Sequence, residues 1–319
     1  MIGNAGFGAP AWHFAAALAG RAFIANALAA EPAKGKGGVH VQLQDATGKS
    51  IAHAEAEPGK SNAAVLMTER TYEPGDRIVF GGVPWMAVRV DTAIPECFVF
   101  GPRAASEDIS YEIPWGHEEK ETGSAYAPQS FSGTSHRITL RTLSKREISG
   151  YRNLALNPCD VIRKDDASVD FYPHASSNSV SRSLFDFEAR NAIDGSSLNG
   201  HHGVWPYQSW GPQLRTDIWW KLDFGRRVRV DKVRLMVRAD FPHDSYWKNA
   251  DLEFSDGSRV PLQISSSATF QEFSFPARRV EWMRIANVVP ADPTKWCARP
   301  CRGSRTWSTV RPAKKLKTW

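Results

Sequence analysis

Apolar and polar residues alternate in short runs through the first half of the chain, with turn-forming residues between the runs. Residues 39–44 alternate strictly, residues 45–49 read as a turn, and the alternation resumes at residue 51. A period of two residues is typical of a strand with one buried face. The further runs expected to form strands are residues 51–56, 64–67, 77–80, 85–90, 97–100, 109–113 and 137–141. Strands this short, at this spacing, predict an antiparallel β-sandwich over residues 35–143.

The strand pattern returns in the second half, where some of the runs are longer. Strands are expected at residues 218–224, 228–237, 250–254, 260–264, 271–275 and 280–285. Phe224-Gly225 and Asp256-Gly257 are turn pairs of the hairpin kind. The whole chain is therefore predicted to be all-β, with two jelly-roll-like β-sandwich domains in tandem. The second domain covers residues 153–295.

Three further segments connect or flank these domains. Residues 144–152 suit a short helical connector that starts at a capping Ser144 and ends near Gly150. Residues 1–34 are expected to be a leader that is either disordered or signal-like. Residues 296–319 have the composition of a basic, disordered tail.

The stretch from residue 191 to residue 220 departs from the strand pattern. It places four Trp, one Tyr and two His in a polar, glycine-rich loop. Aromatic residues of a core normally alternate with aliphatic residues at strand or helix spacing, and these do not. This loop therefore predicts a binding surface, and the rest of the second domain is interpreted around it.

Composition sets limits on the class of protein. The chain has 319 residues, 42% hydrophobic and 23% charged, which is typical of a globular protein with room for two cores. Its net charge is +6, but much of that excess lies between Arg299 and Lys317, so no nucleic-acid partner is predicted. No apolar run of about 18 residues occurs, so no membrane span is expected.

The N-terminal residues leave the cellular location open. Residues 1–30 are rich in alanine, and Ala27-Leu-Ala-Ala resembles the small-residue cleavage site of a signal peptide. However, no Lys or Arg precedes Arg21, and His13 interrupts the apolar part. A functioning signal would place the protein outside the cell or on its surface, and otherwise the protein would be cytoplasmic.

The four cysteines are predicted to be buried free thiols. Cys97, Cys159, Cys297 and Cys301 lack the paired spacing of a zinc site. A disulfide framework is not expected in a chain this long with so few cysteines.

Residues spread over the second domain also resemble a known family. The order Asn153-Leu-Ala-Leu, Ala175-Ser-Ser, Ala192-Ile-Asp-Gly, Trp210, Trp220-Lys-Leu-Asp-Phe-Gly and then residues 228–235 resembles a discoidin or coagulation-factor C-type domain. Such domains are galactose-binding-like sandwiches, and many bacterial examples are family 32 carbohydrate-binding modules. The resemblance covers about residues 153–290 and implies a lectin-like glycan-binding function. The closing strand of the family has no counterpart after Asp292, so the sandwich would lack a strand or borrow one.

The resemblance also implies a structural calcium ion in the Ala-Ile-Asp-Gly loop. Asp194 would be the main oxygen ligand, with Asn191 and Ser197 or Asn199 nearby. The alternative interpretation is that Asp194-Gly195 only makes a turn.

Sugar binding requires a flat aromatic wall and planar hydrogen-bonding side chains. Two loops offer both, residues 201–210 and residues 238–247. Trp210 or Trp247 is the predicted stacking wall, although Trp210 and Trp220 could instead fill the core. The predicted hydroxyl partners are Arg238, Asp240, His243 and Asp244, with His174 and His202 as second choices. Arg238 could alternatively pair with a nearby aspartate as part of the scaffold.

Two other functions remain open at this stage. A glycan-active hydrolase or lyase could have its site between the domains, with Asp240 and Asp244 or Glu118 and Glu119 as carboxylates. A protein- or lipid-docking domain would instead need apolar residues at the loop tips, which are mostly His, Asn and Asp. A non-catalytic polysaccharide- or oligosaccharide-binding protein is the favoured prediction.

Overall fold

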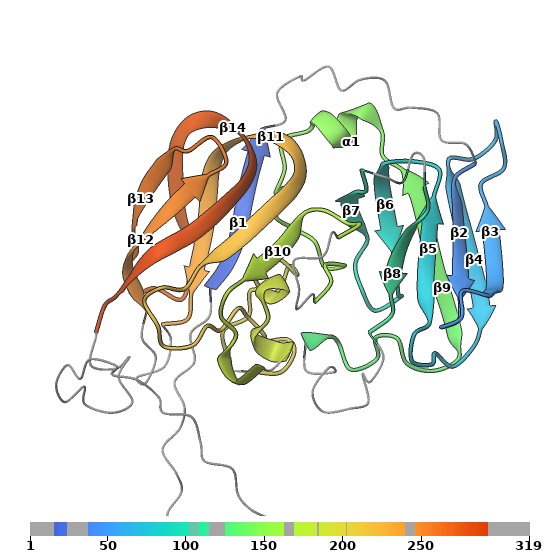
Figure 1. Ribbon diagram of the computed structural model, residues 1–319, viewed down its shortest axis with the longest axis horizontal. Helices are drawn as coiled ribbons and strands as arrows, with labels where there is room; N and C mark the ends of the chain where they lie inside the picture. Colours follow the sequence, from blue (N-terminus) through green and yellow to red (C-terminus); the bar gives the residue numbers. More distant parts are fainter. Residues whose placement is uncertain are drawn as a thin grey trace, which may run out of the picture.

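The chain folds almost entirely into antiparallel strands, as the alternation predicts (Figure 1). The computed structural model describes residues 38–102, 104, 107–114, 125–162, 169–183, 185–201, 203–239 and 246–292, together with the strand Ala16–Phe23. Because the strands are short and antiparallel and their inward side chains form two hydrophobic cores, the predicted all-β class is confirmed.

Two four-stranded sheets face each other in the first half. One has the order β3-β2-β5-β8 and the other β4-β9-β6-β7. The strands are β2 (His40–Gln44), β3 (Ser50–Glu55), β4 (Ala63–Glu69), β5 (Arg77–Gly81), β6 (Trp85–Arg89), β7 (Cys97–Phe100), β8 (Ile109–Glu112) and β9 (Ser135–Thr142). Alternate residues of both sheets, such as Leu43 and Leu140, are fully buried between them. Each strand lies where the two-residue period places it.

A single helical turn follows β9. The helix α1 (Lys145–Ser149) begins at Ser144, whose side-chain oxygen accepts a hydrogen bond from the Glu147 N–H. The Glu147 carboxylate in turn accepts from the Ser144 N–H, at 2.8 Å. This reciprocal pair satisfies two backbone donors at the helix start. The cap predicted at Ser144 is confirmed.

The second half contains one six-stranded sheet in the order β1-β11-β14-β12-β13, with β10 paired to β11. Its strands are β1 (Ala16–Phe23), β10 (His174–Ser177), β11 (Trp220–Val237), β12 (Trp247–Phe254), β13 (Arg259–Gln263) and β14 (Gln271–Pro290). The long strands β11 and β14 curve strongly and enclose the second core (Figure 1). Short 3-10 turns at Ser181–Ser183, Phe185–Phe187 and Ala189–Ala192 precede the loop that leads to β11.

The turn predicted at Phe224-Gly225 is wrong. β11 continues through it, with Gly225 at a φ of +65° and a register shift between Asp223 and Val228. A side chain at Gly225 would also meet the Tyr172 ring, because a Cβ there would lie 2.3 Å from that ring. The glycine therefore lets the strand bend against the first half rather than reverse. The hairpin at Asp256-Gly257 is confirmed, since the Gly257 N–H donates to the Phe254 carbonyl.

An N-terminal segment supplies an edge strand to the second half. β1 pairs antiparallel with β11, from Ala16 opposite Val237 to Phe23 opposite Arg229. Part of the segment expected to be a leader is therefore a strand, and the sandwich gains a strand from the N-terminus. The predicted tail, residues 296–319, lies outside the described residues.

A disulfide joins the two halves. Cys97, the first residue of β7, is bonded to Cys159, 62 residues further along the chain. The prediction of free thiols is therefore wrong for this pair, because Cys159 packs into the core of the first half rather than into that of the second. Cys297 and Cys301 lie outside the described residues.

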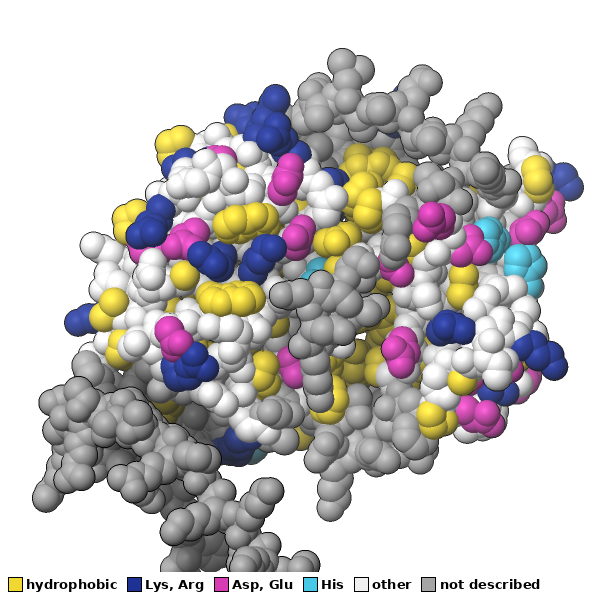
Figure 2. Space-filling model, in the orientation of Figure 1, with side chains coloured by type: hydrophobic (Ala, Val, Ile, Leu, Met, Phe, Trp, Pro, Cys, Tyr) yellow, Lys and Arg dark blue, Asp and Glu magenta, His cyan; other side chains and the backbone are white. Residues whose placement is uncertain are grey.

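Aromatic rings and guanidinium groups fill the rest of this junction. The Arg226 guanidinium lies 4.6 Å from the Trp85 ring centroid and 5.4 Å from that of Phe100. Hydrophobic side chains are visible between the two halves, whereas charged side chains of both signs are scattered over the outer surfaces (Figure 2). No helix among the described residues is long and apolar enough to cross a membrane.

Replacing either bridged cysteine should lower stability substantially. For the loop of 62 residues that this bond closes, the chain-entropy cost corresponds to about 4 kcal/mol. Urea unfolding of Cys97→Ser and Cys159→Ser should therefore show a free energy of unfolding lower by up to that amount. Cys301→Ser, which leaves the pair intact, is the control. Unchanged unfolding of the two variants would contradict the bridge.

Candidate functional site

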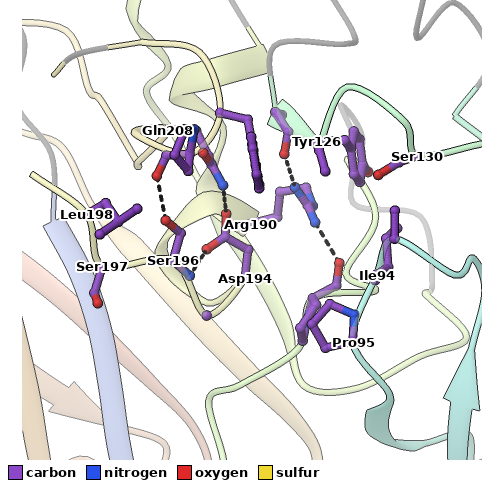
Figure 3. A pocket seen from close by; sticks show the side chains of 17 residues that line it. Ile94, Pro95, Tyr126, Ser130, Arg190, Asp194, Ser196, Ser197, Leu198 and Gln208 are labelled. Carbon is purple, nitrogen blue, oxygen red and sulfur yellow. Dashed lines mark hydrogen bonds between the residues drawn. The ribbon is translucent and has the colours of Figure 1, made fainter. Parts of the chain in front are cut away.

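An open pocket of about 400 Å³ lies at the junction of the two halves (Figure 3). The first half contributes one wall, which contains Ile94, Pro95 and Tyr126. The second half contributes Pro158 and much of the aromatic loop. The loop residues that line the pocket are Asp194, Gly195, Ser196, Ser197, Leu198, Trp205, Pro206 and Gln208. The stretch that departs from the strand pattern thus forms most of one side of the pocket.

Hydrogen bonds within the loop hold these residues in place. Gly195 adopts a φ of +93°, and the Asp194 Oδ1 accepts a bond of 2.8 Å from the Ser196 N–H, which makes a tight turn. The Ser196 hydroxyl then donates to the Pro206 carbonyl at 2.6 Å. The turn at Asp194 and the segment around Trp205 are therefore fixed to each other.

A buried guanidinium forms the floor of the pocket. Arg190 is 2% exposed and donates to the carbonyls of Asp160, at 2.8 Å, and Pro158, at 2.7 Å. It also bonds the Ala125 carbonyl across the junction, at 3.5 Å, and lies 4.5 Å from the Tyr126 ring centroid. Arg190 therefore connects both walls, because its N–H groups reach carbonyl oxygens from each half.

A carboxyl group with a raised pKa lies beside this guanidinium. Burial raises the pKa of Asp194 to about 6, although the Arg190 charge and the hydrogen bonds from Ser196 and Gln208 act in the opposite direction. The Gln208 Nε2 donates to Asp194 Oδ2 at 2.6 Å. The remaining amide oxygen of Gln208 is buried and has no hydrogen-bond partner among the described residues.

The rim of the pocket carries exposed apolar side chains. Trp205 is 40% exposed and Leu198 is 56% exposed, and both line the pocket. The neighbouring Val204 is also 56% exposed. The sequence predicts an indole ring beside polar groups in one binding pocket. The pocket has this combination, but the ring is that of Trp205 rather than Trp210 or Trp247.

The two tryptophans predicted as the stacking wall are buried. Trp210 is 1% exposed and Trp247 is 2% exposed, and their ring centroids lie 5.5 Å apart in the second core. The predicted exposure of Trp247 is wrong because its polar neighbours Lys248 and Asn249 lie on β12, where side chains alternate between faces. A buried residue of a strand with one solvent-facing side is therefore normally followed by a polar residue. The alternative core role of Trp210 and Trp220 is confirmed.

Two further predicted sugar ligands have structural contacts instead. The Arg238 guanidinium is 4% exposed and donates to the backbone carbonyls of Asn199, His201 and Tyr207, so it supports the aromatic loop from beneath. His174 Nδ1 lies 2.7 Å from the fully buried Asp160 carboxylate. Neither residue lines the pocket. The predicted ligands Asp240, His243, Asp244 and His202 lie outside the described residues.

The four residues expected to hold calcium make hydrogen bonds within the protein or face solvent. The amide oxygen of Asn191 accepts a bond of 3.2 Å from Arg190, and both Asp194 oxygens accept N–H bonds. The Asn199 amide donates to the Ala268 carbonyl, and Ser197 is exposed. Calcium requires six to eight oxygen ligands, and the described residues contain no group of three or more His, Cys, Asp or Glu that could hold a metal. Calcium at this loop stays a prediction.

The loop predicted as a binding surface does line the pocket, but Trp205 and Gln208 were not among the predicted site residues. The usable signal was composition, because Trp205 stands between Val204 and Pro206, a context that no regular strand or helix provides. Ile94, Pro95 and Tyr126 could not be found in this way, since they come from the other half of the chain.

Comparisons with known proteins leave the family open. No protein-family model matches the chain, and no curated protein matches it. Among solved structures, a crystal structure of a mutant of chitosan-binding module 1 from a chitosanase/glucanase of Paenibacillus sp. IK-5 is 18% identical, at a TM-score of 0.26. That match covers 38% of this chain and 86% of the module. The solution structure of the same module is 18% identical, with a TM-score of 0.27, and covers 38% and 87% respectively. Similarities at these TM-scores establish neither a shared fold nor a shared ligand.

The raised pKa of Asp194 makes stability depend on pH. The unfolded carboxyl, with a pKa near 3.8, ionises before the folded one, which ionises near 6. The unfolded state therefore loses its proton first, and the free energy of unfolding should fall by up to about 3 kcal/mol as pH rises from 4 to 7. Urea titrations of Asp194→Asn should lack this fall.

An exposed carboxylate provides the control for that measurement. The pKa of Asp217 is lowered by its hydrogen bonds from Arg215, so this group stays ionised across the window. Asp217→Asn should keep the wild-type pH profile. An Asp194→Asn profile that matches wild type would mean that the carboxyl at residue 194 ionises normally.

Proposed function

We propose that the protein binds carbohydrate, without catalysis, in the pocket between its two halves. The observation that carries this proposal is the half-exposed Trp205 ring at the mouth of a pocket that contains Asp194 and Gln208. A sugar ring offers an apolar C–H face and a rim of hydroxyl groups. An indole face and planar polar side chains match these two features.

The size and support of the pocket agree with this proposal. About 400 Å³ lies within the range of small-molecule sites. Its polar groups are fixed in advance, because Asp194 is held by Ser196 and Gln208, and Arg190 holds the backbone beneath it. A preformed pocket loses little entropy when a ligand enters.

The described lining residues give no support for glycoside hydrolysis. That reaction normally uses two carboxyl groups on opposite sides of the scissile bond. Among the described residues that line the pocket, Asp194 is the single carboxylate. Glu118, Glu119, Asp240 and Asp244, the carboxylates considered from the sequence, lie outside the described residues.

A second candidate function is docking onto an apolar surface. The exposed side chains of Leu198, Val204 and Trp205 lie on one loop, at tips that the sequence suggested would be polar. Docking would require the aliphatic pair as much as the indole ring. Leu198→Ala/Val204→Ala should then abolish binding to lipid vesicles or a protein partner, whereas sugar binding should change little.

Removing the indole ring should abolish most sugar affinity. Glycan arrays on the folded, oxidised protein would select a ligand, and calorimetry would follow its affinity. Trp205→Ala should weaken binding by about 2 kcal/mol, or roughly thirtyfold, because the stacking face is lost. Trp282→Ala is the matched control, since Trp282 lies on β14 beside Lys221 and outside the pocket.

Two results would contradict the proposal. One is the absence of binding to any glycan by protein that unfolds cooperatively and contains the disulfide. The other is an affinity that Trp205→Ala leaves unchanged, which would place the sugar site elsewhere.

A further inference from the structure

Arg190 and Ser196 already use their hydrogen-bond donors within the protein, whereas the buried Ser130 hydroxyl, which also lines the pocket, has no partner among the described residues. Arg190 makes four hydrogen bonds to oxygens of Ala125, Pro158, Asp160 and Asn191. The Ser196 N–H and hydroxyl are bonded to Asp194 and Pro206. These donors are therefore occupied before a ligand arrives.

The acceptors of the pocket are not used to the same extent. The Gln208 side chain is 7% exposed, and its amide oxygen has no partner among the described residues. Each Asp194 oxygen accepts one hydrogen bond from the described residues, whereas an ionised carboxylate has about four acceptor positions. A buried acceptor without a donor costs free energy, and a ligand that donates would recover it.

The charges around these acceptors also favour a positively charged donor. Asp194 faces the Arg190 charge, and Arg190 in turn has the Asp160 carboxylate and the Tyr126 and Tyr111 rings as neighbours. Asp160 is fully buried against His174 and does not line the pocket, so Asp194 is the carboxylate that a ligand would meet. The exposed Trp205 ring at the mouth adds a face that attracts cations.

We propose that the group recognised in this pocket is a protonated amine, so that the carbohydrate is an amino sugar. The ammonium group would donate to the Gln208 amide oxygen and the Asp194 carboxylate, while the sugar ring rests on Trp205. This inference rests on the proposed carbohydrate function and names its ligand class. The chain as a whole carries a net charge of +6 and repels cationic oligomers in general, so selective binding requires a local site of this kind.

Three tetrasaccharides with the same β-1,4 linkage separate charge from shape. They are the tetramers of glucosamine, of N-acetylglucosamine and of glucose, tested by calorimetry at pH 6.5 with EDTA present. The glucosamine tetramer should bind at least tenfold more tightly than the glucose tetramer. The preference should grow from pH 5 to pH 6, because Asp194 ionises through this window while most of the amine is still protonated.

Matched variants locate the preference. Asp194→Asn keeps the shape and removes the charge, and Gln208→Leu removes the unpaired acceptor. Each should reduce the preference for the glucosamine tetramer over the glucose tetramer to less than threefold. Asp217→Asn, at an exposed carboxylate outside the pocket, should keep the wild-type preference.

The outcomes distinguish this inference from the function on which it rests. Equal binding of all three tetramers, if Trp205→Ala abolishes it, would contradict recognition of an amine. The proposed carbohydrate site would still be supported. A glucosamine preference that survives Asp194→Asn would overturn the inference, because the amine would then be recognised elsewhere. If the protein bound none of the tetramers and no glycan on the array, both the carbohydrate-binding function and the amino-sugar inference would be wrong.

Discussion

The buried guanidinium of Arg190 is the interaction on which the junction depends. A guanidinium that is 2% exposed would be costly to bury without partners, and its hydrogen bonds to carbonyl oxygens of Ala125, Pro158 and Asp160 offset that cost. These carbonyls come from both halves of the chain. One side chain therefore fixes the backbone of two walls, and the Asp194 turn is placed relative to that fixed backbone.

Arg190 also organises the loop for which the family resemblance implies calcium. A divalent cation at this position would gather carbonyl and carboxylate oxygens around a positive centre. Here a guanidinium gathers such oxygens, including that of Asn191, and lies near Asp194. The loop is therefore held in part by a positive charge that is covalently attached to the chain.

Much of the fold follows from the sequence, because a two-residue period and turn chemistry are local signals. β2, β5 and the hairpin at Asp256-Gly257 lie where these signals place them. The continuity of β11 through Gly225 could not be predicted from the sequence. A glycine that bends a strand and a glycine that ends one give the same local sequence signal. The site was predictable only to the level of its loop. Which tryptophan faces solvent depends on packing in the second core, and one wall of the pocket comes from two distant segments, around Pro95 and around Tyr126.

The bond between Cys97 and Cys159 has a consequence for where the pocket can operate. Pro95 and Pro158, which both line the pocket, lie two residues and one residue from a bridged cysteine. The disulfide therefore holds two lining segments, one from each half, next to each other. In the reducing interior of a cell, disulfides are usually reduced. The pocket is therefore expected to keep this arrangement of its two walls in oxidising surroundings.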